Sequence, residues 1–292
     1  IYTNKKDEFD EITKELHAKL LNLNKQFDIY NNYKDINNIK TINDNAGIKP
    51  VKVQPETLEL IKAGKYAYEK TNKTVNIAMG SVLNIWHNYR ENALNNNVYA
   101  IPTNTELIEA SKHTGINSIV IDENNSTVFI KDKYTSIDVG AIAKGYAADY
   151  AVKYLKSKGI KVALINLGGN VIAINDKDKE SFKTGVVSPN NNDEYIYSFD
   201  LSNQSAVTSG NYQRYYDYNG KRYHHIIDSK TLFPSENNKE VTVVTNSSLE
   251  GDVFSTALFI LPYDEGVKLA KDNNLKVMWI DKNDKQYLYG ID

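Results

Sequence analysis

Four short segments of this sequence carry side chains that could do chemistry together. The first, Ile137–Tyr146, has the sequence IDVGAIAKGY, in which Asp138 ends a predicted strand and Lys144 lies in the first turn of a predicted helix. A helix N-terminus binds phosphate readily, because its free N–H groups and the positive end of its dipole face the ligand. The segment therefore predicts a phosphate site. A helix cap at Asp138 beside a solvated Lys144 is the structural alternative.

The second and third segments add a tight turn and acid–base groups. Paired glycines in Leu167–Asn170 follow a predicted strand, and such glycines let a backbone approach a ligand closely, although a plain turn explains them too. The third segment contains His224, His225 and Asp228. A histidine titrates near neutral pH and can accept a hydroxyl proton. In a strand, adjacent side chains point to opposite faces, so one histidine of the pair would face the site. A surface histidine pair is the alternative.

The fourth segment, Gly251–Ala257, predicts oxygen ligands for a metal ion. Asp252 and Thr256 are four residues apart, so they share one face of a helix. A carboxylate and a hydroxyl suit Mg²⁺ or Ca²⁺ better than Zn²⁺. A helix cap and a buried threonine would explain the same pair. The sequence contains no HExxH, Walker or GxGxxG pattern, which argues against a zinc hydrolase, a P-loop or a dinucleotide-binding site.

The composition is that of an ordinary globular protein. The chain has 292 residues, 41% of them hydrophobic, and a net charge of −2. That balance gives no general attraction to nucleic acid or to anionic membranes, and no apolar run is long enough to span a bilayer. The sequence contains no cysteine, which excludes disulfides and thiolate chemistry.

Hydrophobic spacing and cap residues predict the elements that must position these segments. Helices are expected over 9–27, 55–70, 103–113, 143–158, 252–261 and 263–273. Strands are expected at 118–121, 127–130, 162–167, 275–280 and 286–289, with further short strands between 182 and 245. Helices and strands mix without a regular βαβ rhythm. We therefore predict an α+β fold, with one compact domain over residues 1–292 in which mixed or antiparallel sheets are packed by helices.

In this order the segments resemble the ApbE family, the FAD:protein FMN transferases. The matching patterns are D-x-G-x-x-A-K-G-Y at 138–146, N-x-G-G at 166–169, T-S-G-x-Y-x-R-x at 208–215, H-I-x-D at 225–228 and D-x-x-x-T at 252–256. A weaker match covers 74–86, and the resemblance extends from about Phe27 to the C-terminus. Asn76 stands where the family has an acid, and Ser229 and Leu232 stand where it has proline and glycine.

The resemblance implies transfer of FMN from FAD to a threonine or serine hydroxyl of an acceptor redox protein, with Mg²⁺ and release of AMP. It implies that His225 is the catalytic base. The implied FAD-binding residues are Tyr30, which stacks on the isoalloxazine, and Asn76, Ala78, Met79, Gly80, Asp138, Lys144 and Ile226. The implied metal ligands are the Ala141 carbonyl, Asp252, Ser255 and Thr256.

The resemblance further implies a lipid anchor upstream of Ile1, a place on the extracytoplasmic face of a bacterial cell membrane, and no nucleic-acid partner. Two other functions could use the same residues. With water in place of the acceptor hydroxyl, the protein would be a Mg²⁺-dependent FAD pyrophosphatase that releases FMN and AMP. A non-catalytic flavin-binding protein is the other alternative, and the presence of both His225 and Asp252 argues against it. Each motif taken alone also fits a purely structural module.

Overall fold

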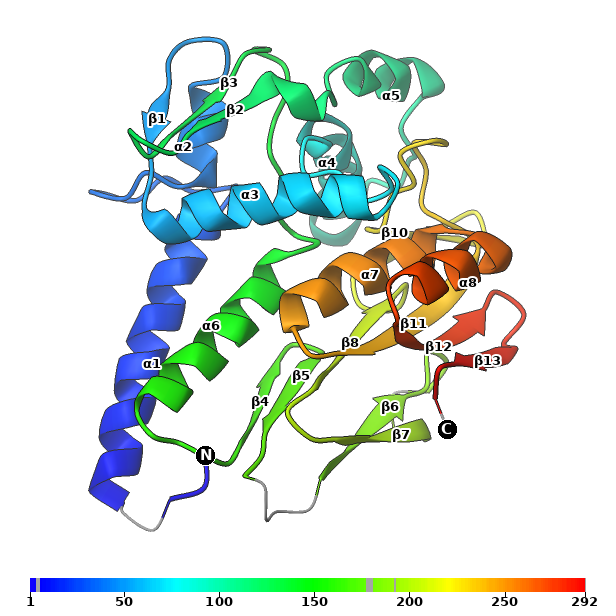
Figure 1. The fold of residues 1–292 in the computed structure, drawn as a ribbon. Coiled ribbons are helices and arrows are strands. Elements are labelled where there is room, and N and C mark those ends of the chain that lie inside the picture. The colour runs from blue at the N-terminus through cyan, green and yellow to red at the C-terminus, as the bar shows by residue number, and fades with distance from the viewer. Residues whose placement is uncertain (4–5, 177–180, 192, 292) are drawn as a thin grey trace. The chain divides into compact units, whose positions relative to one another are not determined.

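The structure is a computed structural model that describes residues 1–3, 6–176, 181–191 and 193–291. Helices and strands are mixed along the chain, and each pair of neighbouring strands in the described sheets is antiparallel (Figure 1). The predicted α+β class with antiparallel sheets is therefore confirmed. The chain divides into two compact units: unit 1 comprises Ile1–Leu23, Ile142–Gly210 and Asn237–Asp292, and unit 2 comprises Asn24–Ala141 and Asn211–Glu236. One domain over 1–292 stays a prediction.

Unit 1 is built on a six-stranded sheet with the order β13-β12-β11-β8-β5-β4. These strands are β4 (Ala163–Leu167), β5 (Asn170–Ile174), β8 (Ser205–Gly210), β11 (Asn238–Thr245), β12 (Lys276–Asp281) and β13 (Gln286–Tyr289). The hairpin of β6 (Phe182–Val187) and β7 (Tyr195–Leu201) packs on one face of the sheet through a core that contains Phe199 and Met278. Helices α6 (Ala143–Ser157), α7 (Ser248–Ile260) and α8 (Tyr263–Asp272) lie on the other face (Figure 1).

Helix α7 is held at its N-terminus by a carboxylate from α6. Asp149 accepts hydrogen bonds from the main-chain N–H groups of Ser248 and Leu249, at 2.8 and 3.0 Å, and from the Ser247 hydroxyl at 2.6 Å. The first N–H groups of a helix have no partner within the helix, and an anion there also interacts favourably with the helix dipole. Gly145 of α6 lies so close to Ser248 that an added Cβ would be 2.3 Å from the Ser248 carbonyl oxygen. These contacts hold α6 against the N-terminal turn of α7.

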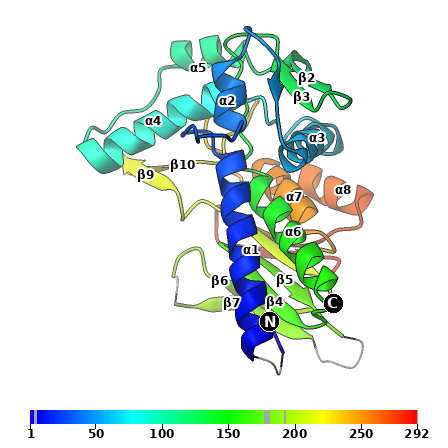
Figure 2. The same cartoon turned by 90° about the vertical axis from the view of Figure 1, so that its left-hand side faces the viewer.

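Unit 2 contains a three-stranded sheet with the order β1-β3-β2 and a separate hairpin of β9 and β10. The strands are β1 (Val51–Lys52), β2 (Ile119–Asp122), β3 (Thr127–Ile130), β9 (Tyr215–Tyr218) and β10 (Lys221–His224). The helices are α2 (Ile39–Asp44), α3 (Pro55–Lys70), α4 (Gly80–Asn96) and α5 (Asn104–Ser111), with a 3₁₀ turn at Ile116–Ser118 and the last residues of α1 (Lys6–Phe27). Figure 2 shows α4 beside the β9–β10 hairpin, where Trp86 packs against Tyr223.

Most predicted elements are confirmed, including the helices at 9–27, 55–70 and 143–158. Helix α7 begins at Ser248 and not near Asp252, because Ser247 is its N-cap. Helices α2 and α4 have no counterpart among the predicted elements. In α4, Val82, Trp86 and Ala93 are buried at helical spacing, but glycine begins the helix and asparagine, a weak helix former, recurs in it. Within the described ranges, no helix has the length and apolar character needed to span a membrane.

We expect Gly145→Ala to lower the free energy of unfolding by about 1–3 kcal/mol, the usual penalty for overpacking. The new Cβ would meet main-chain atoms of Ser248 and Leu249 at 2.3 and 2.6 Å, and these atoms cannot rotate away. Urea unfolding followed by circular dichroism measures the change. Gly115→Ala is the matched control, because no atom lies within 4 Å of its added Cβ. Equal stability of the two variants would contradict the close α6–α7 contact.

Candidate active site

In unit 1, the predicted metal ligands are centred on the carboxylate of Asp252, which is 5% exposed. Its Oδ2 accepts the Gly145 N–H at 2.5 Å, and its Oδ1 accepts a hydrogen bond from the Asn170 side-chain amide at 2.8 Å. Burial raises the pKa of Asp252 to about 6, although the positive charge of Lys144 and both hydrogen bonds act in the opposite direction. At neutral pH this buried carboxylate is mostly ionised, so a positive charge beside it would be strongly favoured.

The paired glycines form the two-residue turn between β4 and β5. Gly168 and Gly169 have φ angles of 59° and 97°, which other residues adopt only with strain. The plain-turn alternative therefore describes the backbone correctly. The turn also positions two side chains near Asp252. The Gly168 carbonyl accepts a hydrogen bond from the Lys144 ammonium at 3.0 Å, and Asn170 directly follows the two glycines. Asn170 is not among the predicted site residues. The feature of the sequence that could have identified it is its position directly after the paired glycines.

The other predicted ligands on α7 differ in their surroundings. The Ser255 hydroxyl is fully buried, 2.9 Å from the Ser209 hydroxyl, and it also donates to the main-chain carbonyl of Asp252 at 3.3 Å. Thr256 is partly exposed. Among the described residues, no group of three or more histidine, aspartate and glutamate side chains is placed to hold a metal. A metal here would therefore be bound by one carboxylate and by neutral oxygens. Ala141 belongs to unit 2, and its role as a ligand stays a prediction.

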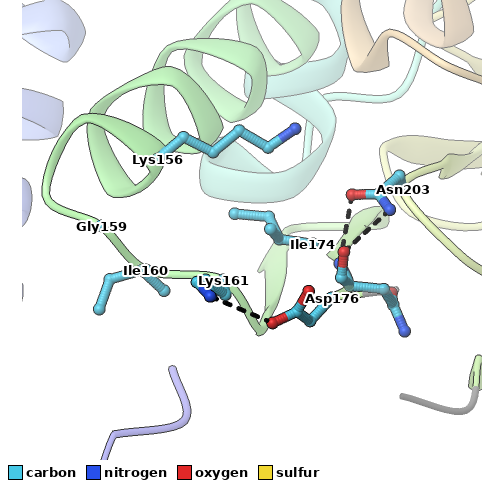
Figure 3. A pocket seen from close by; sticks show the side chains of 8 residues that line it. Lys156, Gly159, Ile160, Lys161, Ile174, Asp176 and Asn203 are labelled. Carbon is cyan, nitrogen blue, oxygen red and sulfur yellow. Dashed lines mark hydrogen bonds and ion pairs between the residues drawn. The ribbon is translucent and has the colours of Figure 1, made fainter. Parts of the chain in front are cut away.

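A surface hollow of about 420 Å³ in unit 1 is lined by none of these residues. It lies beside the end of α6 and the end of β5, and its lining includes Lys156, Ile160 and Asn203 (Figure 3). Lys161 and Asp176 form an ion pair across part of it at 3.6 Å. A surface ion pair of this kind contributes little free energy. We assign no role in the reaction to this hollow.

In unit 2, Asp138 lies beside the segment Asn76–Gly80. The Gly80 N–H donates to the Ser136 carbonyl at 3.0 Å, and the Asp138 N–H donates to the Ile77 carbonyl at 2.9 Å. An added Cβ at Gly80 would lie 2.5 Å from the Ser136 carbonyl oxygen, so only glycine fits here. The structure thus brings together the predicted contacts at Ala78, Met79, Gly80 and Asp138.

Two polar side chains fix the shape of this segment. Asn76 accepts the Ala78 N–H at 2.9 Å and donates to the Thr114 carbonyl at 2.9 Å. An acid at this position could accept the first hydrogen bond but could not donate the second. Asp138 accepts the Gly140 N–H at 2.7 Å. Burial raises the pKa of Asp138, and this hydrogen bond opposes the rise.

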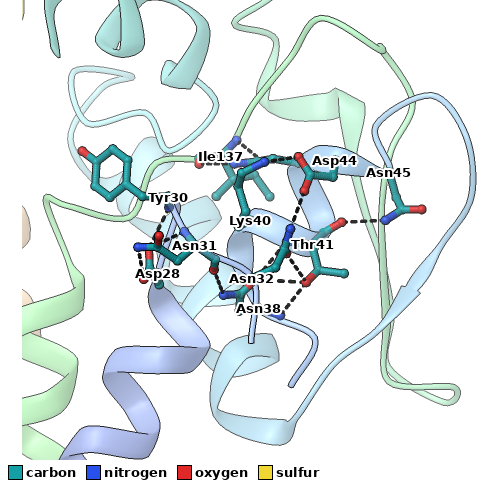
Figure 4. A network of polar contacts seen from close by, with 11 residues as sticks. Asp28, Tyr30, Asn31, Asn32, Asn38, Lys40, Thr41, Asp44, Asn45 and Ile137 are labelled. Atoms are coloured by element: carbon teal, nitrogen blue, oxygen red, sulfur yellow. Dashed lines mark hydrogen bonds and ion pairs between the residues drawn. The ribbon is translucent and has the colours of Figure 1, made fainter. Parts of the chain in front are cut away.

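Tyr30 lies in a loop that the carboxylate of Asp28 holds in place (Figure 4). Asp28 accepts the N–H of Tyr30 at 2.6 Å, the N–H of Asn31 at 3.1 Å and the hydroxyl of Tyr33 at 2.7 Å. The Tyr30 residue itself remains 54% exposed. A fixed backbone that carries an exposed aromatic ring is the arrangement that a stacking residue needs.

Helix α2 connects this loop to the segment before Asp138. The strand predicted to end at Asp138 is not formed, and Ser136 makes only an isolated bridge with Met79. The N-cap of α2, Asn38, donates to the Asn31 carbonyl at 2.7 Å. Its Asn43 exchanges two hydrogen bonds with the main chain of Ile137, at 2.7 and 3.0 Å. Because Ile137 directly precedes Asp138, this short helix sets where the carboxylate lies relative to the loop.

The two adjacent histidines have different partners. Strand β10 ends at His224, and His225 lies in the bend that follows, so the strand alternation expected for the pair does not apply. Nε2 of His224 donates to the Ser235 carbonyl at 2.9 Å, and its Nδ1 accepts the Ile226 N–H at 3.2 Å. Nδ1 of His225 is buried and has no hydrogen-bond partner among the described residues. The other ring nitrogen of His225 is therefore the one that bonds to the main chain of Arg214.

Both histidines are neutral at physiological pH. Burial lowers the pKa of His224 to about 4, and burial together with the charge of Arg214 lowers the pKa of His225 to about 3. Because Nε2 of His225 carries the proton, the lone pair on its Nδ1 is free to accept one. Both ring nitrogens of His224 are hydrogen-bonded to the main chain. Of the pair, His225 alone has the arrangement of a general base.

The loop after His225 keeps a glycine-like conformation without glycine. Leu232, where the family pattern has glycine, has a φ of 65°. This left-handed conformation costs an ordinary residue about 1–2 kcal/mol. The Leu232 carbonyl accepts the Trp86 indole N–H at 2.8 Å, and its side chain packs against the buried cluster of α4 and the β9–β10 hairpin. These contacts offset the strain, and they tie the loop to α4.

A sequence profile of the ApbE family matches residues 1–279 of this chain. A curated FAD:protein FMN transferase from Klebsiella pneumoniae is 32% identical over 84% of this chain and 75% of the relative. The crystal structure of the ApbE protein from Thermotoga maritima is 27% identical, with a TM-score of 0.86, over 96% of this chain and 89% of that chain. The flavin transferase ApbE from Vibrio cholerae is 25% identical, with a TM-score of 0.79, over 96% and 88% of the two chains.

We expect His224→Ala to lower the free energy of unfolding by about 2 kcal/mol, and His225→Ala to change it by less than half of that. The first substitution removes two main-chain hydrogen bonds of His224, whereas the second removes only the bond of His225 to the Arg214 main chain, because Nδ1 of His225 bonds to nothing in the described chain. Urea unfolding at neutral pH measures both changes. A larger loss in His225→Ala would reverse these structural assignments.

We also expect Asp252 to make stability depend on pH when metal ions are chelated. The raised pKa means that the folded state holds the proton more tightly than the unfolded state, so the contribution is greatest below about pH 4. The contribution of Asp252 to the free energy of unfolding falls by about 3 kcal/mol as the pH rises from about 4 to 6, and it stays constant at higher pH. The side chain of Asp252→Asn cannot ionise. The free energy of unfolding of this variant should therefore rise relative to that of the wild type between about pH 4 and 6. Parallel pH profiles of the two proteins would contradict the buried carboxylate.

Proposed function

This chain belongs to the ApbE family, and we propose that His225 and Asp252 carry the chemical step of its reaction. The enzyme transfers FMN from FAD to an acceptor protein, which is the activity that names its curated relatives. The single observation that carries the proposal is the buried Nδ1 of His225, which has no partner among the described residues. A neutral imidazole with a free lone pair can accept a proton, and a bound pyrophosphate anion beside His225 would raise its low pKa toward the range of a general base.

The acceptor nucleophile in this proposal is a threonine or serine hydroxyl. Its oxygen attacks the phosphorus on the FMN side of the FAD pyrophosphate, and Nδ1 of His225 takes the hydroxyl proton. The new P–O bond joins FMN to the acceptor as a phosphoester, while the P–O bond to the AMP phosphate breaks and AMP leaves. Solvent then removes the proton from His225. General-base help of this kind is worth about 10²–10⁴-fold in rate.

The proposed FAD contacts follow the geometry of unit 2. Tyr30 offers an exposed ring for stacking, and Asp138 lies beside the segment Asn76–Gly80. At Ile226 the N–H is bonded to His224 and the carbonyl accepts the Ser235 N–H, so its contact with FAD would come from the side chain. Lys144, in unit 1, would add positive charge for a phosphate.

The oxygen set of unit 1 fits a magnesium ion. Asp252 supplies an ionised carboxylate, Thr256 a hydroxyl one turn later, and the Asn170 Oδ1 is a buried oxygen without a partner among the described residues. When bound, Mg²⁺ would offset the negative charge that builds on the leaving phosphate. The chain's own part is to orient the carboxylate through Gly145 and Asn170. Ser255 as a ligand stays a prediction, since its hydroxyl is already bonded within the unit.

The identity of the partner and the location of the enzyme are also proposals. An acceptor redox protein with a threonine or serine motif, a lipid anchor and an extracytoplasmic place at the cell membrane follow from the resemblance to the family. Flavin transfer itself supports only the statement that a protein acceptor exists.

We expect His225→Ala to lower the transfer rate by about 10²–10⁴-fold while FAD binding remains. The assay incubates enzyme, FAD and a redox protein with the acceptor motif, and then measures flavin fluorescence on the denatured acceptor. His17→Ala, which removes an exposed histidine of α1, is the matched control. Transfer by His225→Ala at the wild-type rate would show that another group is the base.

The same assay tests the metal and the hydrolytic alternative. A chelator and Asp252→Ala should each abolish transfer. Added Mg²⁺ should restore transfer by the chelated wild-type enzyme but not by Asp252→Ala. Unchanged transfer under both conditions would rule out the metal site. Free FMN and AMP without labelled acceptor would instead identify the enzyme as an FAD pyrophosphatase.

A further inference from the structure

The ring of Tyr30 has an aromatic neighbour that none of the family motifs includes. The imidazole of His87, on α4, lies with its centroid 4.8 Å from the Tyr30 ring and is tilted by 33°. The His87 side chain is 24% exposed, and Tyr30 is 54% exposed. The pair is therefore open to solvent and is not a sealed core contact. A planar ligand that stacks on Tyr30 would come within reach of His87.

Arg90 fixes the tautomer of His87. Its Nη2 lies 2.7 Å from Nδ1 of His87, one helical turn away on α4. A guanidinium can only donate hydrogen bonds, so Nδ1 accepts and a neutral His87 carries its proton on Nε2. Burial and the charge of Arg90 lower the pKa of His87, which favours this neutral form. Arg90 itself is only 15% exposed, and its nearest carboxylate, Glu91, is 3.6 Å away.

The surroundings of His87 are those of the proposed FAD contacts. Asp138 and Arg214 both act electrostatically on the Tyr30 hydroxyl and on the His87 ring. Asp138 is the carboxylate beside the segment Asn76–Gly80. His87 therefore lies in the same part of unit 2 as the residues assigned to the cofactor, with an N–H to donate and a ring to stack.

We propose that His87 binds the isoalloxazine ring of FAD together with Tyr30, donating a hydrogen bond from Nε2 to an oxygen or nitrogen acceptor on the ring edge. Arg90 is a positioning residue, because it fixes the proton on the nitrogen that faces the ligand. This proposal rests on the proposed function, in which FAD is the substrate. It adds a residue that recognises the flavin end of FAD and leaves the chemical step to His225.

Titration of the purified protein with FAD tests the proposal through binding and through the visible absorption band of the flavin. His87→Ala should weaken FAD binding on the order of tenfold, as expected for one lost hydrogen bond and one lost ring contact. The loss should appear in KM for FAD and not in kcat, and the band shift of bound flavin should shrink. His87→Phe keeps a ring and should recover part of the affinity without the shift. His87→Gln keeps a donor and should recover part of the shift.

Arg90→Ala tests the positioning role, and nitrogen NMR of the His87 ring is its readout. The proton should no longer be fixed on Nε2, and FAD binding should weaken less than in His87→Ala. Asn88→Ala, an exposed neighbour on α4, is the matched control and should behave as wild type. Wild-type affinity and spectrum in His87→Ala, or a fall in kcat with KM unchanged, would overturn the proposal. If wild type itself bound no FAD, the proposed function would fail with it, and the two failures are thereby distinguished.

Discussion

Burying the Asp252 carboxylate in unit 1 carries a free-energy penalty that polar partners must offset, and much of the local architecture supplies those partners. Helix α6 presents the Gly145 N–H, the β4–β5 turn delivers Asn170, and Lys144 adds charge. Each partner depends on a constraint elsewhere. The Gly145 N–H reaches Asp252 because this position has no side chain, and the turn forms because its two glycines accept positive φ. The remaining electrostatic demand of this carboxylate is what a divalent cation would meet.

Unit 2 solves a different problem, which is to hold exposed groups in fixed positions. In the proposed role of Tyr30 as a stacking residue, its ring must remain open to FAD and cannot be fixed by burial. Its backbone is fixed instead, by the Asp28 carboxylate and by the asparagines of α2. Asparagine suits this task because its amide donates and accepts at once, as Asn43 does against the main chain of Ile137. The many asparagines of this sequence thus include several that act as local braces.

The histidine pair shows how neighbouring residues of one type receive different roles. Both ring nitrogens of His224 form hydrogen bonds with the main chain, and these bonds shape the loop that carries His225. That loop passes through Leu232, which is held in a left-handed conformation by a hydrogen bond from Trp86. The proposed base is thus supported by a helix, α4, that also carries His87 and Arg90. One element therefore links the loop that carries His225 to the aromatic pair at Tyr30.

The sequence by itself determined the fold class, most helices and strands, and the motifs at Asp138, Asp252 and His225, because spacing and residue type are local properties. Tertiary structure alone decided which histidine keeps a free nitrogen, since this depends on the carbonyls of Ser235 and Arg214. It also placed Asn170 against Asp252 and His87 against Tyr30, across 82 and 57 positions of the chain (252 − 170 and 87 − 30). Such contacts leave no periodic trace in the sequence. The physical reason is that a side chain's role is set by its partners, and packing brings those partners together from distant segments.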